Sequence, residues 1–123
     1  GESFSESTDD EHGHVTHTMK FGSATKYVHS GNLRSADLSS SFGELGVFFE
    51  DATAADNNVL INCRVSFGEM DLYIPKDWYV DNRISVSLGN CDDSCSASNP
   101  AEHSVICRIE GNVAFGELKL VRI

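Results

Sequence analysis

The residue types best suited to metal or thiol chemistry are four cysteines and five histidines. Cys91 and Cys95 resemble one half of a zinc site, but zinc needs four ligands, and such a pair is usually accompanied by a second Cys or His pair nearby. His12, His14 and His17 are close enough in sequence to bind a transition metal together. They lie in or beside a very polar segment, so a solvated cluster is favoured. We expect no metal and no cofactor, while a Cys91–Cys95 disulfide stays open.

Two groups of acidic residues could supply the acid–base pair of a hydrolase. They are Asp92, Asp93 and Glu102, and the evenly spaced Glu44, Glu69 and Glu117. A general acid needs a carboxyl group whose pKa is raised by burial beside its partner. The alternation of the sequence places these carboxylates on outward positions. No Gly-x-Ser-x-Gly or Walker motif is present either, so we expect a protein that is not an enzyme and has no catalytic residue.

Composition limits the classes of protein further. The chain has 123 residues, 40% of them hydrophobic, and a formal net charge of -10. These values are typical of one soluble globular domain, and no run approaches the ~18 apolar residues of a membrane helix. Acidity excludes nucleic acid as a partner, because binding to phosphates depends on clustered Lys and Arg. The start at Gly1, without Met or a leader, predicts a piece of a longer protein.

The chain divides into a tail and one domain. Residues 1–14 (GESFSESTDDEHGH) are acidic and polar and contain one aromatic residue, which is too little apolar surface to offset the entropy of ordering. We expect a disordered acidic tail over residues 1–14 and a β-solenoid domain over residues 15–123.

Phe-Gly steps form the repeat that predicts this solenoid. The five steps are Phe21-Gly22, Phe42-Gly43, Phe67-Gly68, Leu88-Gly89 and Phe115-Gly116. Apolar residues alternate with polar ones on both sides of each step, which is typical of strands with one buried face. Aligning the steps predicts two inward columns, one of the five Phe or Leu residues and one of Ala24, Leu45, Met70, Cys91 and Leu118.

The predicted fold is all-β: a single-stranded β-helix of about four to five short rungs, with Gly at the corners because its dihedral angles are free. Phe42 and Phe67 are then buried neighbours on consecutive rungs. Cys63 and Cys107 fall on inward positions two rungs apart, too far for a disulfide. An antiparallel sandwich with Phe-Gly β-bulges is the alternative.

Several segments together resemble the C-terminal domain of the LiaF family, the cell-wall-active antibiotics response proteins. They are SSSFGELGVFFEDA (39–52), VSFGEMDLYIPKDWYV (65–80), VSLGN (86–90) and VAFGELKL (113–120). The resemblance covers roughly residues 15–123. This chain departs from the pattern of the family in two ways. It has Glu at positions 44, 69 and 117, where the family often has a second Gly, and it has Leu88 where the family has Phe.

This resemblance implies a single-stranded β-helix behind N-terminal membrane helices that would precede Gly1, and therefore association with the cell membrane. It implies a sensory or interaction domain that modulates a two-component system of the envelope stress response, with a sensor histidine kinase as the protein partner. The family brings no catalytic or cofactor residue, and no small-molecule substrate is evident. Reduced cysteines favour the cytoplasmic side. An adhesin-like or structural surface module stays open as the alternative function.

The best candidate for a partner surface is a pair of aromatic residues predicted to face outward. Phe48 and Tyr73 lie on adjacent predicted rungs and would form an exposed stripe, with Glu50 and Asp71 as its polar surround. Trp78 could also be a surface anchor, but packing over the end of a coil is favoured.

Overall fold

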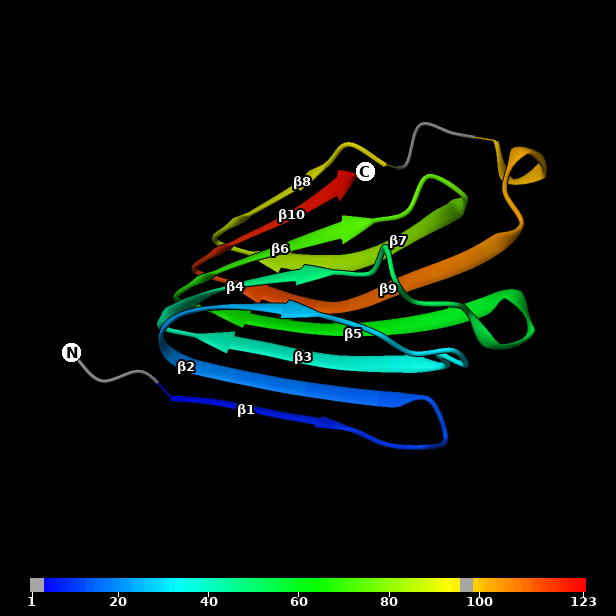
Figure 1. Ribbon diagram of the computed structural model, residues 1–123. Coiled ribbons are helices and arrows are strands. Elements are labelled where there is room, and N and C mark those ends of the chain that lie inside the picture. The colour runs from blue at the N-terminus through cyan, green and yellow to red at the C-terminus, as the bar shows by residue number, and fades with distance from the viewer. Residues whose placement is uncertain (1–3, 96–98) are drawn as a thin grey trace.

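The computed structural model describes residues 4–95 and 99–123, and for Phe4 and Ser5 only the backbone. It is all-β, with two single-turn 3-10 helices, η1 and η2 (Figure 1). The elements are β1 (Phe4–Asp9), β2 (His14–Tyr27), β3 (Ser35–Ser41), β4 (Gly43–Phe48), η1 (Ala55–Asn57), β5 (Asn58–Ser66), β6 (Glu69–Ile74), β7 (Trp78–Ser87), β8 (Asn90–Asp93), η2 (Pro100–Glu102), β9 (Val105–Ala114) and β10 (Glu117–Arg122).

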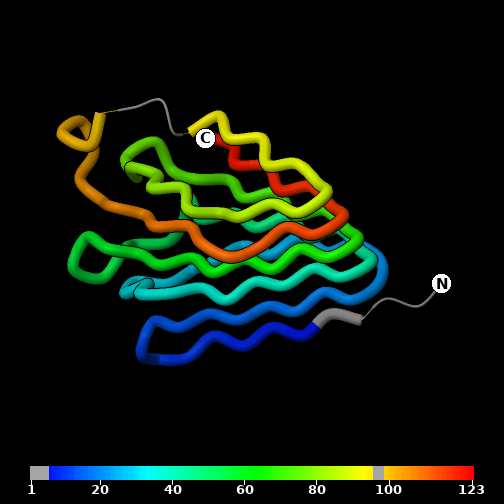
Figure 2. Tube along the Cα trace, turned by 180° about the vertical axis from the view of Figure 1, so that it is seen from behind, coloured from blue at the N-terminus to red at the C-terminus, as the bar shows by residue number. Residues whose placement is uncertain are grey.

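The strands form two layers that meet along one corner, at the left of Figure 1. Layer A has the order β1-β2-β3-β5-β9-β7 and faces the viewer in Figure 2. Layer B has the order β2-β4-β6-β10-β8 and lies at the front of Figure 1. β2 runs through the corner and belongs to both layers, and among the described strands only the β1–β2 pair is antiparallel. This nearly closed parallel arrangement is consistent with the predicted solenoid and differs from an antiparallel sandwich.

The core lies between the layers and follows the predicted alternation. Leu45, Met70 and Leu118 stack in register on neighbouring strands of layer B, with Ala24 and Cys91 at the two ends of the column. The facing strands of layer A contribute buried Ile61, Cys63, Val65, Cys107, Ile109 and Val113. Side chains repeating every second residue therefore form one continuous apolar interior.

The predicted inward column of phenylalanines is wrong. Phe42 is 59% exposed and Phe67 and Phe115 are each 50% exposed. These three residues have φ near +55°, in the left-handed region, and so does Leu88. A left-handed residue interrupts the alternation of the strand, so its side chain points out of the corner. Phe42 and Phe67 are neighbours, as predicted, but their rings stack on the surface with centroids 5.2 Å apart.

The corner glycines are required for close approach rather than for their dihedral angles. Only Gly22 among them has positive φ. A Cβ atom on Gly68 would lie 2.5 Å from the carbonyl oxygen of Gly43, and one on Gly116 would lie 2.4 Å from that of Gly68. Consecutive corners therefore stack through their backbones. The sequence reasoning expected the positive φ at the glycine of each step, which is correct at Gly22 but wrong at the other four corners, where the preceding Phe or Leu has it.

The order of the last two strand pairs also differs from the prediction. β9 and β10 follow β7 and β8 in sequence, yet β9 pairs with both β5 and β7, and β10 with both β6 and β8. β7 and β8 therefore do not lie next to β5 and β6. The space between them in each layer is occupied by the later strands β9 and β10. Cys63 and Cys107 consequently lie on adjacent strands, although offset by four residues, since Val59 is the partner of Cys107.

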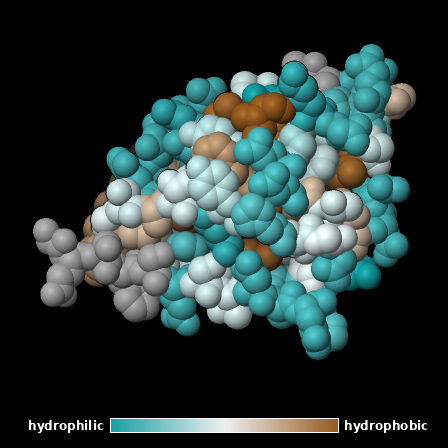
Figure 3. All heavy atoms as spheres, in the orientation of Figure 1, coloured by the Kyte–Doolittle hydropathy of each residue, from teal (hydrophilic) through white to brown (hydrophobic). Residues whose placement is uncertain are grey.

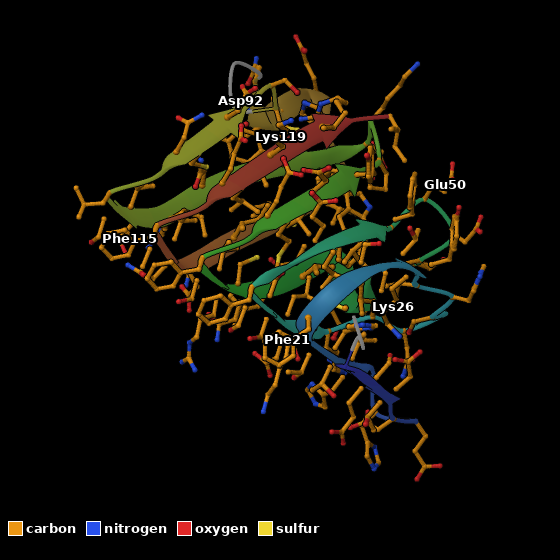
Figure 4. All side chains as sticks on the ribbon, turned by 90° about the vertical axis from the view of Figure 1, so that its left-hand side faces the viewer. Phe21, Lys26, Glu50, Asp92, Phe115 and Lys119 are labelled. Carbon is orange, nitrogen blue, oxygen red and sulfur yellow. The ribbon has the colours of Figure 1, made fainter. Side chains whose placement is uncertain are left out.

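Residues 1–14 were expected to be a disordered tail, but the structure has β1 at Phe4–Asp9 within them. β1 pairs with β2 and so satisfies the backbone groups of an edge strand, which needs little apolar burial. The Asp10 carboxylate fixes the connecting turn by accepting hydrogen bonds from the backbone N–H groups of His12 and His14, both at 2.9 Å. Lys26 Nζ donates to Asp9 Oδ1 at 2.9 Å. Lys26 lies in the part of β2 that begins layer B (Figure 4). Residues 1–3 lie outside the described residues.

Arg122 joins the segments at the opposite end of the molecule. Its guanidinium donates to the carbonyl oxygens of Pro75, Lys76, Trp78 and Cys95. Trp78 is buried and packs against Phe49, with ring centroids 5.9 Å apart. Trp78 therefore belongs to the core, in agreement with the packing role favoured from the sequence.

Candidate functional site

Three aromatic rings form a stack on the outer face of layer B. Tyr27, Phe48 and Tyr73 occupy equivalent positions on β2, β4 and β6, six residues after a corner phenylalanine. The ring centroids are 4.9 Å apart between Tyr27 and Phe48 and 4.1 Å apart between Phe48 and Tyr73. The planes differ by 15° and 5°. The stack follows from the parallel register, because identical positions on successive strands lie directly above one another.

Carboxylates dominate the rest of this face. Parallel pairing places Glu44, Glu69 and Glu117 in one row and Asp71, Lys119 and Asp92 in a second row. The outward positions of the described layer B strands thus hold five carboxylates against one ammonium group, which leaves the face strongly negative. Lys119 Nζ lies 3.4 Å from Glu69 Oε1. Lys119 and Asp92 lie on the neighbouring strands β10 and β8 (Figure 4). The side drawn in Figure 3 is mostly hydrophilic, as this arrangement requires.

A groove lies between the aromatic stack and the row of glutamates. Its volume is about 510 Å³, and its lining includes Tyr27, Glu44, Gly46, Phe48, Glu69, Asp71 and Tyr73. Gly46 occupies the second outward position of β4, where its neighbours carry the side chains of Thr25 and Asp71. The missing side chain leaves a notch in the middle of the face. A second hollow lies between Glu44 and Glu69 on one side and the corner rings of Phe42 and Phe67 on the other.

The surroundings of Asp71 disfavour the ionised form of its carboxyl group. Burial raises the pKa of its carboxyl group, and the negative charges of Glu69, Glu117 and Glu44 raise it further, while Lys119 lowers it. Its Oδ1 atom is buried and accepts no hydrogen bond from the described residues. The groove therefore contains an incompletely compensated negative charge beside an aromatic wall.

The structure brings together three of the four residues predicted for the partner surface. Phe48, Tyr73 and Asp71 all line the groove, whereas Glu50 is exposed in the turn after β4 and is not among the lining residues. The sequence reasoning missed Tyr27 and Gly46. Tyr27 shares the six-residue offset that Phe48 and Tyr73 have from their corner phenylalanines, so the repeat contained the signal. Gly46 could be recognised only after the register was known.

The residues considered for thiol and metal chemistry do not gather into a site. No disulfide joins any of the four cysteines, all of which lie among the described residues. Burial raises the pKa of the Cys63 and Cys107 thiols, which keeps them protonated and unreactive. His17 faces the core, while His12 and His14 are exposed. Within residues 4–95 and 99–123, no three His, Cys, Asp or Glu side chains are arranged to hold a metal ion.

Of the two acidic groups considered for catalysis, Asp92, Asp93 and Glu102 do not share one face, whereas Glu44, Glu69 and Glu117 lie side by side. The outward position expected for Asp93 is wrong: it faces inward at the end of layer B, level with buried Leu120, and accepts a hydrogen bond from Asn82 Nδ2 at 2.9 Å. Asp92 is exposed on the same strand, and Glu102 is exposed in η2. The row of Glu44, Glu69 and Glu117 is on the outer face, as its spacing predicted.

Comparison of the chain with protein-family models, curated proteins and solved structures gives no match. None of the helices in the described part of the chain has the length and hydropathy needed to span a membrane.

Proposed function

We propose that this chain is a non-catalytic interaction domain that binds a protein partner through the outer face of layer B. The observation that carries the proposal is the groove in which Phe48, Tyr73 and Asp71 meet. Rigid aromatic anchors beside polar groups are typical of protein interfaces. Neighbouring strands hold the backbone of the groove in place, so its shape exists before a partner binds.

We further propose that the domain belongs to a membrane-linked regulator of the envelope stress response and that its partner is a sensor histidine kinase. The resemblance to LiaF proteins supports this part of the proposal, through the segments 39–52 and 65–80 that supply most of the groove. The same resemblance supports a solenoid of five turns. Those turns would be β2, β3 with β4, β5 with β6, β9 with β10, and β7 with β8.

A photocrosslinking experiment in cells tests the proposed surface. A benzoylphenylalanine introduced at position 48 of the full-length protein should crosslink to a membrane-bound histidine kinase. The matched control is the same residue at position 60, because Leu60 is exposed on the outer face of layer A. We expect the kinase adduct from position 48 alone.

A paired substitution tests whether the surface carries the function. Phe48→Ser with Tyr73→Ser should change the output of an envelope-stress reporter, whereas Leu60→Ser with Ile106→Ser should leave it unchanged. Removing the stacked rings should lower the free energy of unfolding by about 1–3 kcal/mol, since each aromatic pair contributes about 0.5–1.5 kcal/mol. An unchanged reporter in a folded double variant, or crosslinks only to envelope polymers, would overturn the proposal; the second result would favour the adhesin-like alternative.

A further inference from the structure

Gly46 is a glycine that the fold does not require. Its φ is not in the left-handed region, and a Cβ atom there would meet only Tyr73 Cε2, at an ordinary 3.8 Å. Gly68, by contrast, would collide with a backbone carbonyl oxygen if it carried a side chain. Glycine in the middle of a strand weakens the strand and often marks a site where another molecule approaches closely. The notch at Gly46 therefore needs an explanation outside the packing of this chain.

Asp71 shows what kind of group complements the notch. Its two neighbours across layer B are Lys119 on β10 and Gly46 on β4. On one side, Lys119 supplies a positive charge that also reaches Glu69. On the other side there is no side chain, and Asp71 Oδ1 accepts no hydrogen bond from the described residues. The molecule thus contains one basic side chain beside Asp71 and a vacant equivalent position on the opposite side.

We infer that the groove binds a lysine or arginine side chain of the partner, inserted over Gly46 from a basic segment. This inference depends on the proposed function and specifies the chemistry of the partner at that same surface. The cationic head would lie between Asp71 and the carboxylates of Glu44 and Glu69, as Lys119 lies on the other side of Asp71. The aliphatic stem would pack against Phe48 and Tyr73, because long basic side chains bury their stems along apolar surfaces.

Other occupants fit the groove less well. A metal ion would need three suitably arranged ligands, and the described residues contain no such group. A glycan would need exposed faces of aromatic rings, but the rings of Phe48 and Tyr73 cover each other at 4.1 Å. An acidic partner would be repelled by the five carboxylates. A basic protein segment is the occupant that matches both the charge and the aromatic wall.

Binding of a labelled peptide tests the inference on the intact chain. The probe is a fluorescein-labelled peptide of alternating Arg and Ser, and the control probe has citrulline at each Arg. Fluorescence anisotropy should show binding of the Arg peptide only, weakening as salt rises. Gly46→Val fills the notch, and we expect at least a tenfold loss of affinity. Gly31→Val is the matched control, since a Cβ at Gly31 has no atom within 4 Å and lies away from the groove.

Two further variants separate insertion in the notch from attraction to an acidic surface. Asp71→Asn should weaken binding about tenfold, whereas Asp37→Asn, an equal charge change on the outer face of layer A, should have little effect. Gly46→Lys should abolish binding because the chain's own ammonium group then occupies the site. Thermal unfolding of each variant establishes that it is folded.

The possible results distinguish this inference from the proposed function. Equal affinities of the Gly46→Val and Gly31→Val variants, no binding of the Arg peptide, or binding of chitotetraose in its place would each overturn the insertion of a basic side chain. If Gly46→Val also leaves the kinase crosslink from position 48 intact, the partner surface stands and only its proposed chemistry fails. If the chain with the crosslinker at position 48 and no other substitution gives no kinase crosslink, the proposed function itself is overturned.

Discussion

At the scale of single residues, the corner phenylalanines form a row of rings stacked along the surface, and three of them, Phe42, Phe67 and Phe115, have a left-handed backbone. The labelled Phe115 and Phe21 lie toward the two ends of this row (Figure 4). Phe67 stacks on Phe42 and on Phe115, with ring centroids 5.2 Å and 4.8 Å apart. Phe67→Ala should therefore lower the free energy of unfolding by about 1–3 kcal/mol, the sum of two aromatic contacts. Chemical denaturation measures this change.

Met70 is the appropriate comparison for Phe67. It lies three residues away and is fully buried, so Met70→Ala should cost about 2–5 kcal/mol. A loss of 3–5 kcal/mol for Phe67→Ala, as for a buried aromatic side chain, would contradict the exposed position of its ring.

The pKa of Asp71 makes a second prediction at this scale. A folded-state pKa raised above the ordinary value of 3.8 means that the folded protein binds the proton more tightly than the unfolded chain does. Ionised Asp71 therefore lowers stability at neutral pH, and this penalty disappears as pH falls through the raised pKa toward 3.8. Asp71→Asn should raise the free energy of unfolding at pH 7, by no more than about 1 kcal/mol.

Thermal unfolding across a pH series checks the Asp71 prediction. The gain from Asp71→Asn should shrink as pH falls through the raised pKa of Asp71 and should be absent well below pH 3.8. Asp37→Asn supplies the control, because Asp37 is exposed on the other layer. A gain of the same size at pH 3 would show that the carboxyl charge is not its cause.

At the scale of single elements, a corner glycine, Gly68, and a strand glycine, Gly46, should respond in opposite directions to substitution. Gly68→Ala places a Cβ 2.5 Å from a carbonyl oxygen of the adjacent corner, so we expect a loss of about 1–3 kcal/mol or more from overpacking. Gly46→Thr adds a residue that favours strands at a position with room for it, and should stabilise the fold by about 0.5–1 kcal/mol. Urea denaturation of both variants tests the pair; destabilisation by Gly46→Thr would mean that β4 itself requires this glycine.

The strands show how far the sequence determines the elements. Alternation in 59–65 and 70–74 predicted β5, β6 and their buried faces, because every second side chain must enter one core. The same alternation failed at Phe67, where one left-handed residue reverses the phase. No local pattern marks which residue of a Phe-Gly pair takes that conformation. The close approach of stacked corners explains why the second residue is glycine, and this contact exists only after the corners are assembled.

At the scale of the whole molecule, β1 protects one end of the stack of strands. It covers the layer A edge of β2, and its Asp9 pairs with Lys26 beneath layer B. Removal of residues 1–10 should leave the edge of β2 unpaired, which favours association of chains through that edge. Sedimentation velocity should show association that increases with concentration in the truncated chain but not in the full chain. A monomeric truncated chain of unchanged stability would contradict a protective role for β1.

The candidate surface was partly predictable at this scale. Phe48, Tyr73 and Asp71 could be assigned to one face from the phase of each strand, because that phase is local. The notch at Gly46 and the third ring, Tyr27, depend on which strands are neighbours. The order of neighbouring strands was predicted correctly as far as β6 and wrongly for β7 to β10. The repeated sequence pattern does not indicate whether consecutive strand pairs lie side by side or are separated by a later pair.

The placement of β9 and β10 between earlier strands has a consequence for how the chain is made. Ribosomes release β7 and β8 first, but the partners of these strands are β9 and β10. Turn-by-turn growth behind the ribosome can therefore proceed only as far as β6. β7 and β8 acquire their strand partners only after β9 and β10 have been made. The strands that complete both layers, β9 and β10, are therefore made after the strands that they join.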